Sequence, residues 1–176
     1  NDSQYQSLGS QIKCNPAIKS ENDRLALWDA LNNDLLDVIA TDHAPHTWDE
    51  KQGKYLQAPS GLPLVQHSLQ LMFQHAIDGK ISMERAIEKM CHAPADLFAI
   101  EDRGYLKEGY WADVVVLKKE AQTVAKDNIL YKCGWSPLEG RKFDYRVEHS
   151  IVSGHLAYSK GQFDESVKGR RLSFGR

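Results

Sequence analysis

The chain contains the stretch Leu35-Leu36-Asp37-Val38-Ile39-Ala40-Thr41-Asp42-His43-Ala44-Pro45-His46, and this stretch decides the fold that we predict. Its first six residues are mostly apolar, which indicates a buried strand. Asp42 and His46 follow directly, four residues apart. In an α/β barrel the catalytic groups stand just past the carboxyl ends of the strands. A carboxylate at such a position can bind a metal ion or accept a proton, and an imidazole can bind a metal or hold a substrate.

Length and composition are those of an ordinary globular domain. The 176 residues are 41% hydrophobic and 26% charged, with a net charge of −2, and this balance argues against nucleic acid or an anionic membrane as a partner. No apolar run is long enough to cross a bilayer. The three cysteines form no Cys-x-x-Cys pair, which favours a reducing, cytoplasmic setting. Because the first residue is Asn1, we expect the chain to start inside a longer polypeptide.

The elements around the opening stretch alternate as in a parallel α/β unit. Residues 11–14 are predicted to form a short strand, and Ser20 is a suitable N-cap for the helix that follows. The buried stripe of this helix is expected to consist of Leu25, Trp28 and Leu31. The strand over residues 35–40 comes next.

The rest of the chain divides into helices and then strands. Helices are predicted over residues 64–77, after Ser82 and from Pro94, with a polar loop over residues 47–61 before them. A buried strand is predicted over residues 112–117, and a hairpin is predicted around Ser153-Gly154. We therefore predict barrel units over residues 1–102 and a β-sandwich-like tail over residues 103–176.

Four motifs, in this order, resemble the C-terminal part of dihydroorotases, which belong to the amidohydrolase superfamily. Together they extend over most of the chain. They are Lys13-Cys14-Asn15-Pro16, the segment from Ala40 to His46, Ala58-Pro59-Ser60-Gly61, and the segment from Gly104 to Asp113.

The resemblance implies an α/β fold: the last two units of a TIM-type (β/α)8 metal-dependent hydrolase barrel, plus part of a small β-sandwich subdomain. Asp42 would end the eighth strand and bind one metal of a binuclear zinc centre. It would also take the proton of the attacking water and pass it to the leaving nitrogen. Zinc contributes by lowering the pKa of water to roughly 7.

The resemblance also implies the residues that bind substrate. His46 would face the substrate carboxylate, Asn15 would hydrogen-bond the ring or its carboxylate, and the backbone of Ser60 and Gly61 would close on the ring. Without the motifs, His46 would be interpreted as a surface histidine and Asn15 as part of an ordinary turn. His43 is interpreted as a packing residue or as one that supports the site without binding the metal, because neighbouring strand residues point to opposite faces.

The implied reaction is the reversible hydrolysis of dihydroorotate, a small-molecule substrate, to N-carbamoyl-L-aspartate in pyrimidine biosynthesis. The remaining metal ligands would come from an N-terminal barrel segment, so this chain alone is expected to be inactive, and the complete protein is expected to be a homodimer. Two alternatives stay open. One is a hydantoinase or allantoinase on the same scaffold, and the other is a catalytically silent relative that serves as a scaffold protein.

Overall fold

The structure is a computed structural model that describes residues 1–175, and it consists of two compact units. The first unit is formed by Asn1–Leu35, Ala40–Leu71 and Thr123–Lys142. The second is formed by Leu36–Ile39, Met72–Gln122 and the chain from Phe143 onward. Each unit thus draws on both sides of residue 102, and the division into barrel units and tail stays a prediction about the complete fold.

The first unit is built mainly from short helices. They are η1 Asp2–Gln4, α1 Tyr5–Leu8, η2 Gly9–Ile12, α2 Glu21–Asn32, α3 Trp48–Lys51, η3 Val65–His67, the start of α4 Ser68–Ile77, and η5 Lys126–Asn128. The Ser20 cap of α2 is confirmed, since the Ser20 side chain accepts from the Asp23 backbone N–H. The expected stripe of α2 is only partly buried: Leu31 is buried, whereas Leu25 is 49% exposed.

The two strands predicted for the barrel do not form within the described residues. Residues 9–12 are a 3₁₀-helix, and residues 35–40 form no strand. In the second unit, the Ile39 N–H donates to the carbonyl of Lys89 at 3.0 Å, and Lys89 belongs to a helical turn rather than to a strand. Parallel strands depend on hydrogen bonds to neighbouring strands. Among residues 1–175 these segments have no such neighbour, and an apolar pattern alone does not hold an extended segment in a sheet.

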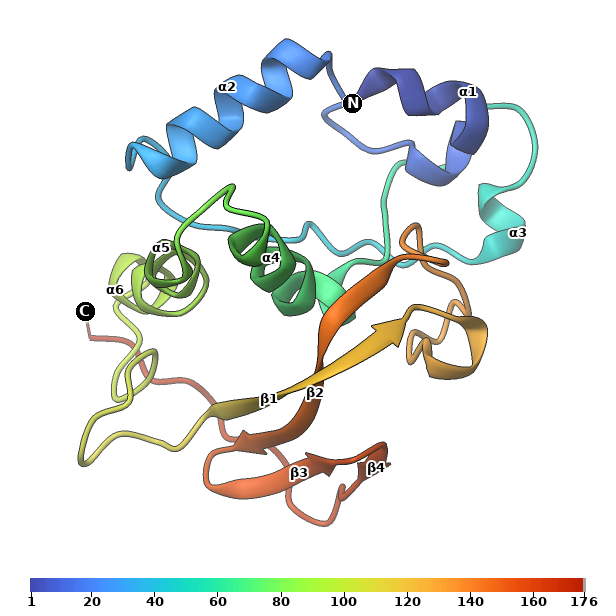
Figure 1. The fold of residues 1–176 in the computed structure, drawn as a ribbon. Helices are drawn as coiled ribbons and strands as arrows, with labels where there is room; N and C mark the ends of the chain where they lie inside the picture. The colour runs from blue at the N-terminus through green and yellow to red at the C-terminus, as the bar shows by residue number, and fades with distance from the viewer. Residues whose placement is uncertain (176) are drawn as a thin grey trace. The chain divides into compact units, whose positions relative to one another are not determined.

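The helices of the second unit follow the sequence prediction closely. α5 Met83–Ile87, the π-helical turn η4 Glu88–His92 and α6 Ala93–Leu97 continue one another (Figure 1). Ser82 caps the first of them by accepting from the Arg85 N–H at 3.0 Å, and Pro94 lies in the first turn of α6. The helix predicted over residues 64–77 is also present, as η3 and α4.

A four-stranded sheet is formed by the later part of the chain (Figure 1). Its order is β1 Val114–Thr123, β2 Lys142–Val152, β3 His155–Ser159 and β4 Gln162–Phe163. β2 and β3 are antiparallel around the turn at Ser153 and Gly154, which confirms the predicted hairpin. β1 is confirmed as a strand, but its predicted burial is wrong, because it is the edge strand and Val115 is 47% exposed.

Each unit has a small core of its own. The buried apolar residues of the first unit are Ile12, Leu31, Ala58, Val124 and Trp135. Those of the second are Met72, Ile81, Ala86, Ala95 and Phe143. With its helices and its four-stranded sheet, the fold is α/β, as predicted.

Candidate functional site

Asp42 lies in the left-handed region of the backbone map, with a φ of 45°, a conformation that aspartate adopts more readily than most residues. Its carboxylate is exposed and makes no hydrogen bond or ion pair with any residue in 1–175. Both oxygens are therefore accessible as acceptors or ligands.

His43, directly after it, is used in packing, as predicted. Its Nδ1 accepts from the Leu64 backbone N–H at 3.0 Å, and its ring lies 5.2 Å from the ring of Tyr131. An Nδ1 that accepts a hydrogen bond carries no proton, so this imidazole is in the form protonated at Nε2.

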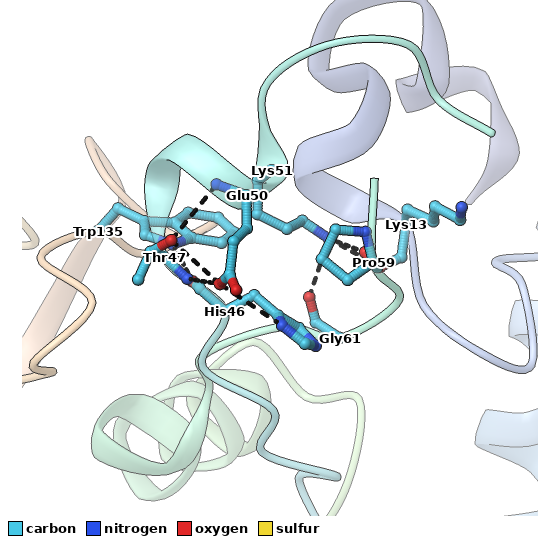
Figure 2. Close-up of polar contacts among 8 residues, drawn as sticks. All are labelled: Lys13, His46, Thr47, Glu50, Lys51, Pro59, Gly61 and Trp135. Carbon is cyan, nitrogen blue, oxygen red and sulfur yellow. Dashed lines mark hydrogen bonds and ion pairs between the residues drawn. The ribbon is translucent and has the colours of Figure 1, made fainter. Parts of the chain in front are cut away.

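His46 is held at both its backbone and its side chain. Its carbonyl accepts from the buried Trp135 indole Nε1–H at 2.8 Å, and its Nδ1 lies 3.7 Å from a carboxylate oxygen of Glu50 (Figure 2). Glu50 belongs to α3, where it forms a reciprocal capping box with Thr47. The Thr47 N–H holds the pKa of the Glu50 carboxyl below its usual value, so a negative charge stands beside the imidazole.

α3 corrects the prediction of a continuous polar loop over residues 47–61. The capping box is the physical reason: Thr47 and Glu50 satisfy the first backbone N–H groups and allow one helical turn to form.

The segment with His46 lies against the segment with Ser60 and Gly61. The Ala44 N–H donates to the Leu62 carbonyl at 3.1 Å, and His43 pairs with Leu62 in a parallel bridge. Gly61 has a φ of 141°, and a Cβ there would meet the Ala44 Cβ at 2.5 Å and the His46 Cδ2 at 3.1 Å. Only glycine permits this approach without a shift of its neighbours.

The segment with Asn15 joins the same cluster through its neighbour Lys13. The Gly61 N–H donates to the Lys13 carbonyl at 2.9 Å. Lys51 Nζ donates to that same carbonyl at 3.1 Å and to the carbonyls of Pro59 and Gly61 at 2.9 and 3.0 Å (Figure 2). The segments before Asn15, around Ser60 and around His46 therefore meet in one unit.

The structure brings some predicted site residues together and leaves others apart. His46 and Gly61 are in close contact, and Ser60 is half-buried beside them. Asn15 is exposed two residues beyond Lys13, and neither its side chain nor that of Asp42 bonds to the others within residues 1–175. No three His, Cys, Asp or Glu side chains in this described range are grouped so that they could hold a metal ion.

Sequence reasoning missed the two side chains that hold this cluster. From the sequence, Lys51 would be interpreted as an exposed lysine within the polar segment 47–61, and no pattern of neighbouring residues predicts its burial. Trp135 lies in the first unit, where its indole N–H donates to the His46 carbonyl. Its presence in a Gly-Trp-Ser-Pro turn was the one available signal that it is a buried anchor.

Comparison with known proteins places the chain in a family. The sequence model of the amidohydrolase family matches residues 11–157, and the chain belongs to this family. Among curated relatives, it is 37% identical to the dihydroorotase of Clostridium acetobutylicum over 152 residues, 85% of this chain and 36% of that protein. It is 33% identical to the dihydroorotase of Pyrococcus furiosus over 162 residues, 92% of this chain and 37% of that protein. The predicted resemblance to dihydroorotases is confirmed, and the chain spans little more than a third of these relatives.

Solved structures agree with the family. An L-hydantoinase (dihydropyrimidinase) from Arthrobacter aurescens superposes with a TM-score of 0.84 at 27% identity, over 93% of this chain and 38% of that one. A D-hydantoinase superposes with a TM-score of 0.83 at 21% identity, over the same shares of both chains, and shows the fold alone. None of the helices described in residues 1–175 is long and apolar enough to cross a membrane.

Proposed function

We propose that this chain is the C-terminal part of a cyclic amide hydrolase of the dihydroorotase type. The reaction is the reversible hydrolysis of dihydroorotate to N-carbamoyl-L-aspartate, a step of pyrimidine biosynthesis. The observation that carries the proposal is the meeting of His46, Gly61 and the segment before Asn15 in one cluster. The dihydroorotase relatives support this choice of substrate.

The proposed substrate has two features that this cluster suits, a carboxylate and a ring with amide groups. His46 can donate to the carboxylate, and the amide of Asn15 can both donate to and accept from the ring. The backbone of Ser60 and Gly61 would close on the ring, and glycine at position 61 lets this backbone lie against Ala44 and His46. Together these contacts would fix the orientation of the ring, which is a large part of the catalytic effect in a hydrolysis.

Asp42 is the proposed catalytic carboxylate. It would accept a proton from the attacking water and deliver it to the ring nitrogen that leaves. Its exposed oxygens also suit a single metal ligand, and we propose that it contributes one ligand to a binuclear zinc centre. Zinc, when bound, supplies a water of lowered pKa. The other ligands would have to come from elsewhere, since the described residues 1–175 contain no ligand cluster.

Exposed apolar surface on α2 supports the proposal that further barrel elements cover this chain in the complete enzyme. Leu25 and Leu27 are 49% and 59% exposed, and Leu35, just beyond α2, is 76% exposed. Leu25 and Leu27 point to different sides of α2, and apolar exposure on more than one side of a helix is expected where further elements cover it. This same proposal includes the assignment of the chain to a barrel and a β-sandwich. It also includes the inactivity of this chain alone, a homodimeric complete protein and a cytoplasmic setting.

The test is hydrolysis of dihydroorotate by the complete, zinc-loaded protein that contains this chain, with hydantoin and allantoin as comparison substrates. Asp42→Ala should abolish turnover and leave the circular dichroism spectrum unchanged. The matched control is Asp127→Ala, an exposed aspartate of η5 outside the proposed barrel strand, which should keep full activity. An Asp42→Ala variant that still hydrolyses dihydroorotate would sink the assignment.

His46→Ala in the same assay separates binding from chemistry. If His46 holds the substrate carboxylate equally in the ground state and the transition state, its loss should raise KM and leave kcat nearly unchanged. Unchanged KM and kcat would mean that His46 does not touch the substrate.

The hydantoinase alternative is favoured by one observation, the TM-score of 0.84 with a hydantoinase at 27% identity. Preference for hydantoin over dihydroorotate would replace the substrate and keep the reaction class. No turnover of any of the three substrates, despite bound zinc, would favour the silent scaffold protein.

A further inference from the structure

Lys51 is the most unusual charged residue of the first unit. Its side chain is fully buried, with 0% of its surface exposed, and it makes no ion pair with any described residue in 1–175. Its Nζ donates to three backbone carbonyls instead, those of Lys13, Pro59 and Gly61, at 2.9 to 3.1 Å (Figure 2). An ammonium group has three donors, so all of them are used.

This arrangement makes the buried charge and the loop backbone depend on each other. A buried ammonium is tolerated only when its donors are satisfied, and three carbonyl oxygens that face one point are tolerated only when a donor stands between them. Burial, and then the charge of Lys13, lower the pKa of the Lys51 ammonium.

Lys51 is itself anchored on the side away from the carbonyls. Its own carbonyl accepts from the Ser10 hydroxyl, and its N–H donates to the Thr47 carbonyl at 3.2 Å. A second lysine, Lys13, binds the same loop: its Nζ donates to the carbonyls of Tyr55 and Ala58 at 2.8 and 2.6 Å. The two lysines thus hold the whole stretch between α3 and Gly61 against the segment that leads to Asn15.

We propose that Lys51 is a positioning residue, whose buried ammonium fixes the segments of Asn15 and of Ser60–Gly61 in the arrangement that receives the substrate ring. The inference rests on the proposed function for the identity of the substrate. Because Lys51 is fully buried, it acts through these backbone segments and does not touch the substrate.

The test compares Lys51→Met with Lys54→Met, which removes an exposed lysine from the same loop. Lys51→Met keeps an unbranched side chain that is one atom shorter and loses all three donors. The first readout is amide hydrogen exchange of residues 52–62, with α2 as the internal reference. Exchange there should rise about tenfold or more in Lys51→Met and stay unchanged in Lys54→Met, because local opening governs exchange.

The second readout is steady-state hydrolysis of dihydroorotate by the complete zinc-loaded protein. Loosened substrate segments should raise KM by about tenfold or more in Lys51→Met with a smaller change in kcat. Lys51→Arg keeps the charge and part of the hydrogen bonding, so it should restore both readouts in part. Lys54→Met should match the parent.

Several outcomes would overturn the proposal. Unchanged exchange over residues 52–62 in Lys51→Met would do so, and so would a raised exchange with unchanged KM. If Lys51→Met also raises exchange in α2 and is therefore unfolded, Lys51→Gln decides, because it removes the charge and keeps only two donors. Loop exchange and KM equal to the parent in Lys51→Gln would overturn the proposal. If the parent protein hydrolyses no cyclic amide, the proposed function fails, and the exchange readout still decides whether Lys51 holds the segments.

Discussion

Gly61→Ala tests the close approach on which the candidate site depends. In the structure the new Cβ would stand 2.5 Å from the Ala44 Cβ, 3.0 Å from the Ala44 carbonyl oxygen and 3.1 Å from the His46 Cδ2. Carbon atoms in favourable contact are about 3.5–4.0 Å apart, so Ala44 would have to move by roughly 1 Å. The backbone of residues 44–46 would move with it, because one close atom is the Ala44 carbonyl oxygen and another is the Ala44 Cβ, which is bonded directly to the backbone.

The magnitude has two parts. Overpacking of this kind costs about 1–3 kcal/mol. The positive φ of 141° adds strain for a residue with a side chain, about 1–2 kcal/mol. Gly61→Ala should therefore lower the free energy of unfolding by about 2–5 kcal/mol, out of about 5–15 kcal/mol for a typical domain.

Gly53→Ala is the matched control, because Gly53 also has a positive φ, of 96°, and its Cβ would meet nothing within 4 Å. It should show the strain alone, about 1–2 kcal/mol. The assay is urea unfolding followed by tryptophan fluorescence, which reports on the first unit through Trp48 and Trp135, whose rings are 5.6 Å apart. With a urea slope of about 1–3 kcal/mol/M, the two variants should differ in midpoint by roughly 1 M.

Equal midpoints for Gly61→Ala and Gly53→Ala would refute the reasoning, because they would mean that residues 43–46 and 59–62 do not pack as described. A second variant sharpens the test. Adding Ala44→Gly to Gly61→Ala removes the closest contact and should recover part of the loss, as expected for residues that touch.

Two further predictions concern the anchors of the first unit. Trp135→Phe removes the donor to the partly buried His46 carbonyl and should lower the free energy of unfolding by about 1–3 kcal/mol, measured by urea unfolding followed by circular dichroism. Trp48→Phe changes a half-exposed neighbour without that bond and should cost clearly less. Equal losses in the two variants would contradict the role of the indole N–H. Arg24, with a contribution from Asn1, lowers the pKa of Glu21 from 4.5 to about 2, so the folded state binds this proton less tightly than the unfolded state. The stabilisation from Glu21 is therefore complete above about pH 4.5 and is lost as the pH falls towards 2. Between pH 6 and pH 3, the urea midpoint of Glu21→Gln should fall less than that of the parent. An equal fall in both proteins would contradict this assignment.

Local signals in the sequence predicted the local structure well. Ser20 and Ser82 begin helices because a hydroxyl that accepts a backbone N–H is a property of a few adjacent residues. The turn at Ser153 and Gly154 forms a hairpin for the same kind of reason. The order of the four motifs was sufficient to recognise the family, since a resemblance depends on residue identity and spacing alone.

Features that depend on distant partners were decided by the tertiary structure. Residues 35–40 have the apolar pattern of a barrel strand, yet strand pairing needs neighbouring strands, and their own pattern does not supply them. Likewise, the sequence by itself determined that residues 40–46 and 58–61 are motifs, but only the tertiary structure shows that Gly61 lies against His46. Lys51 is the clearest case. Its three carbonyl partners lie 8, 10 and 38 residues away along the chain, and no pattern of adjacent side chains predicts where a backbone carbonyl will point.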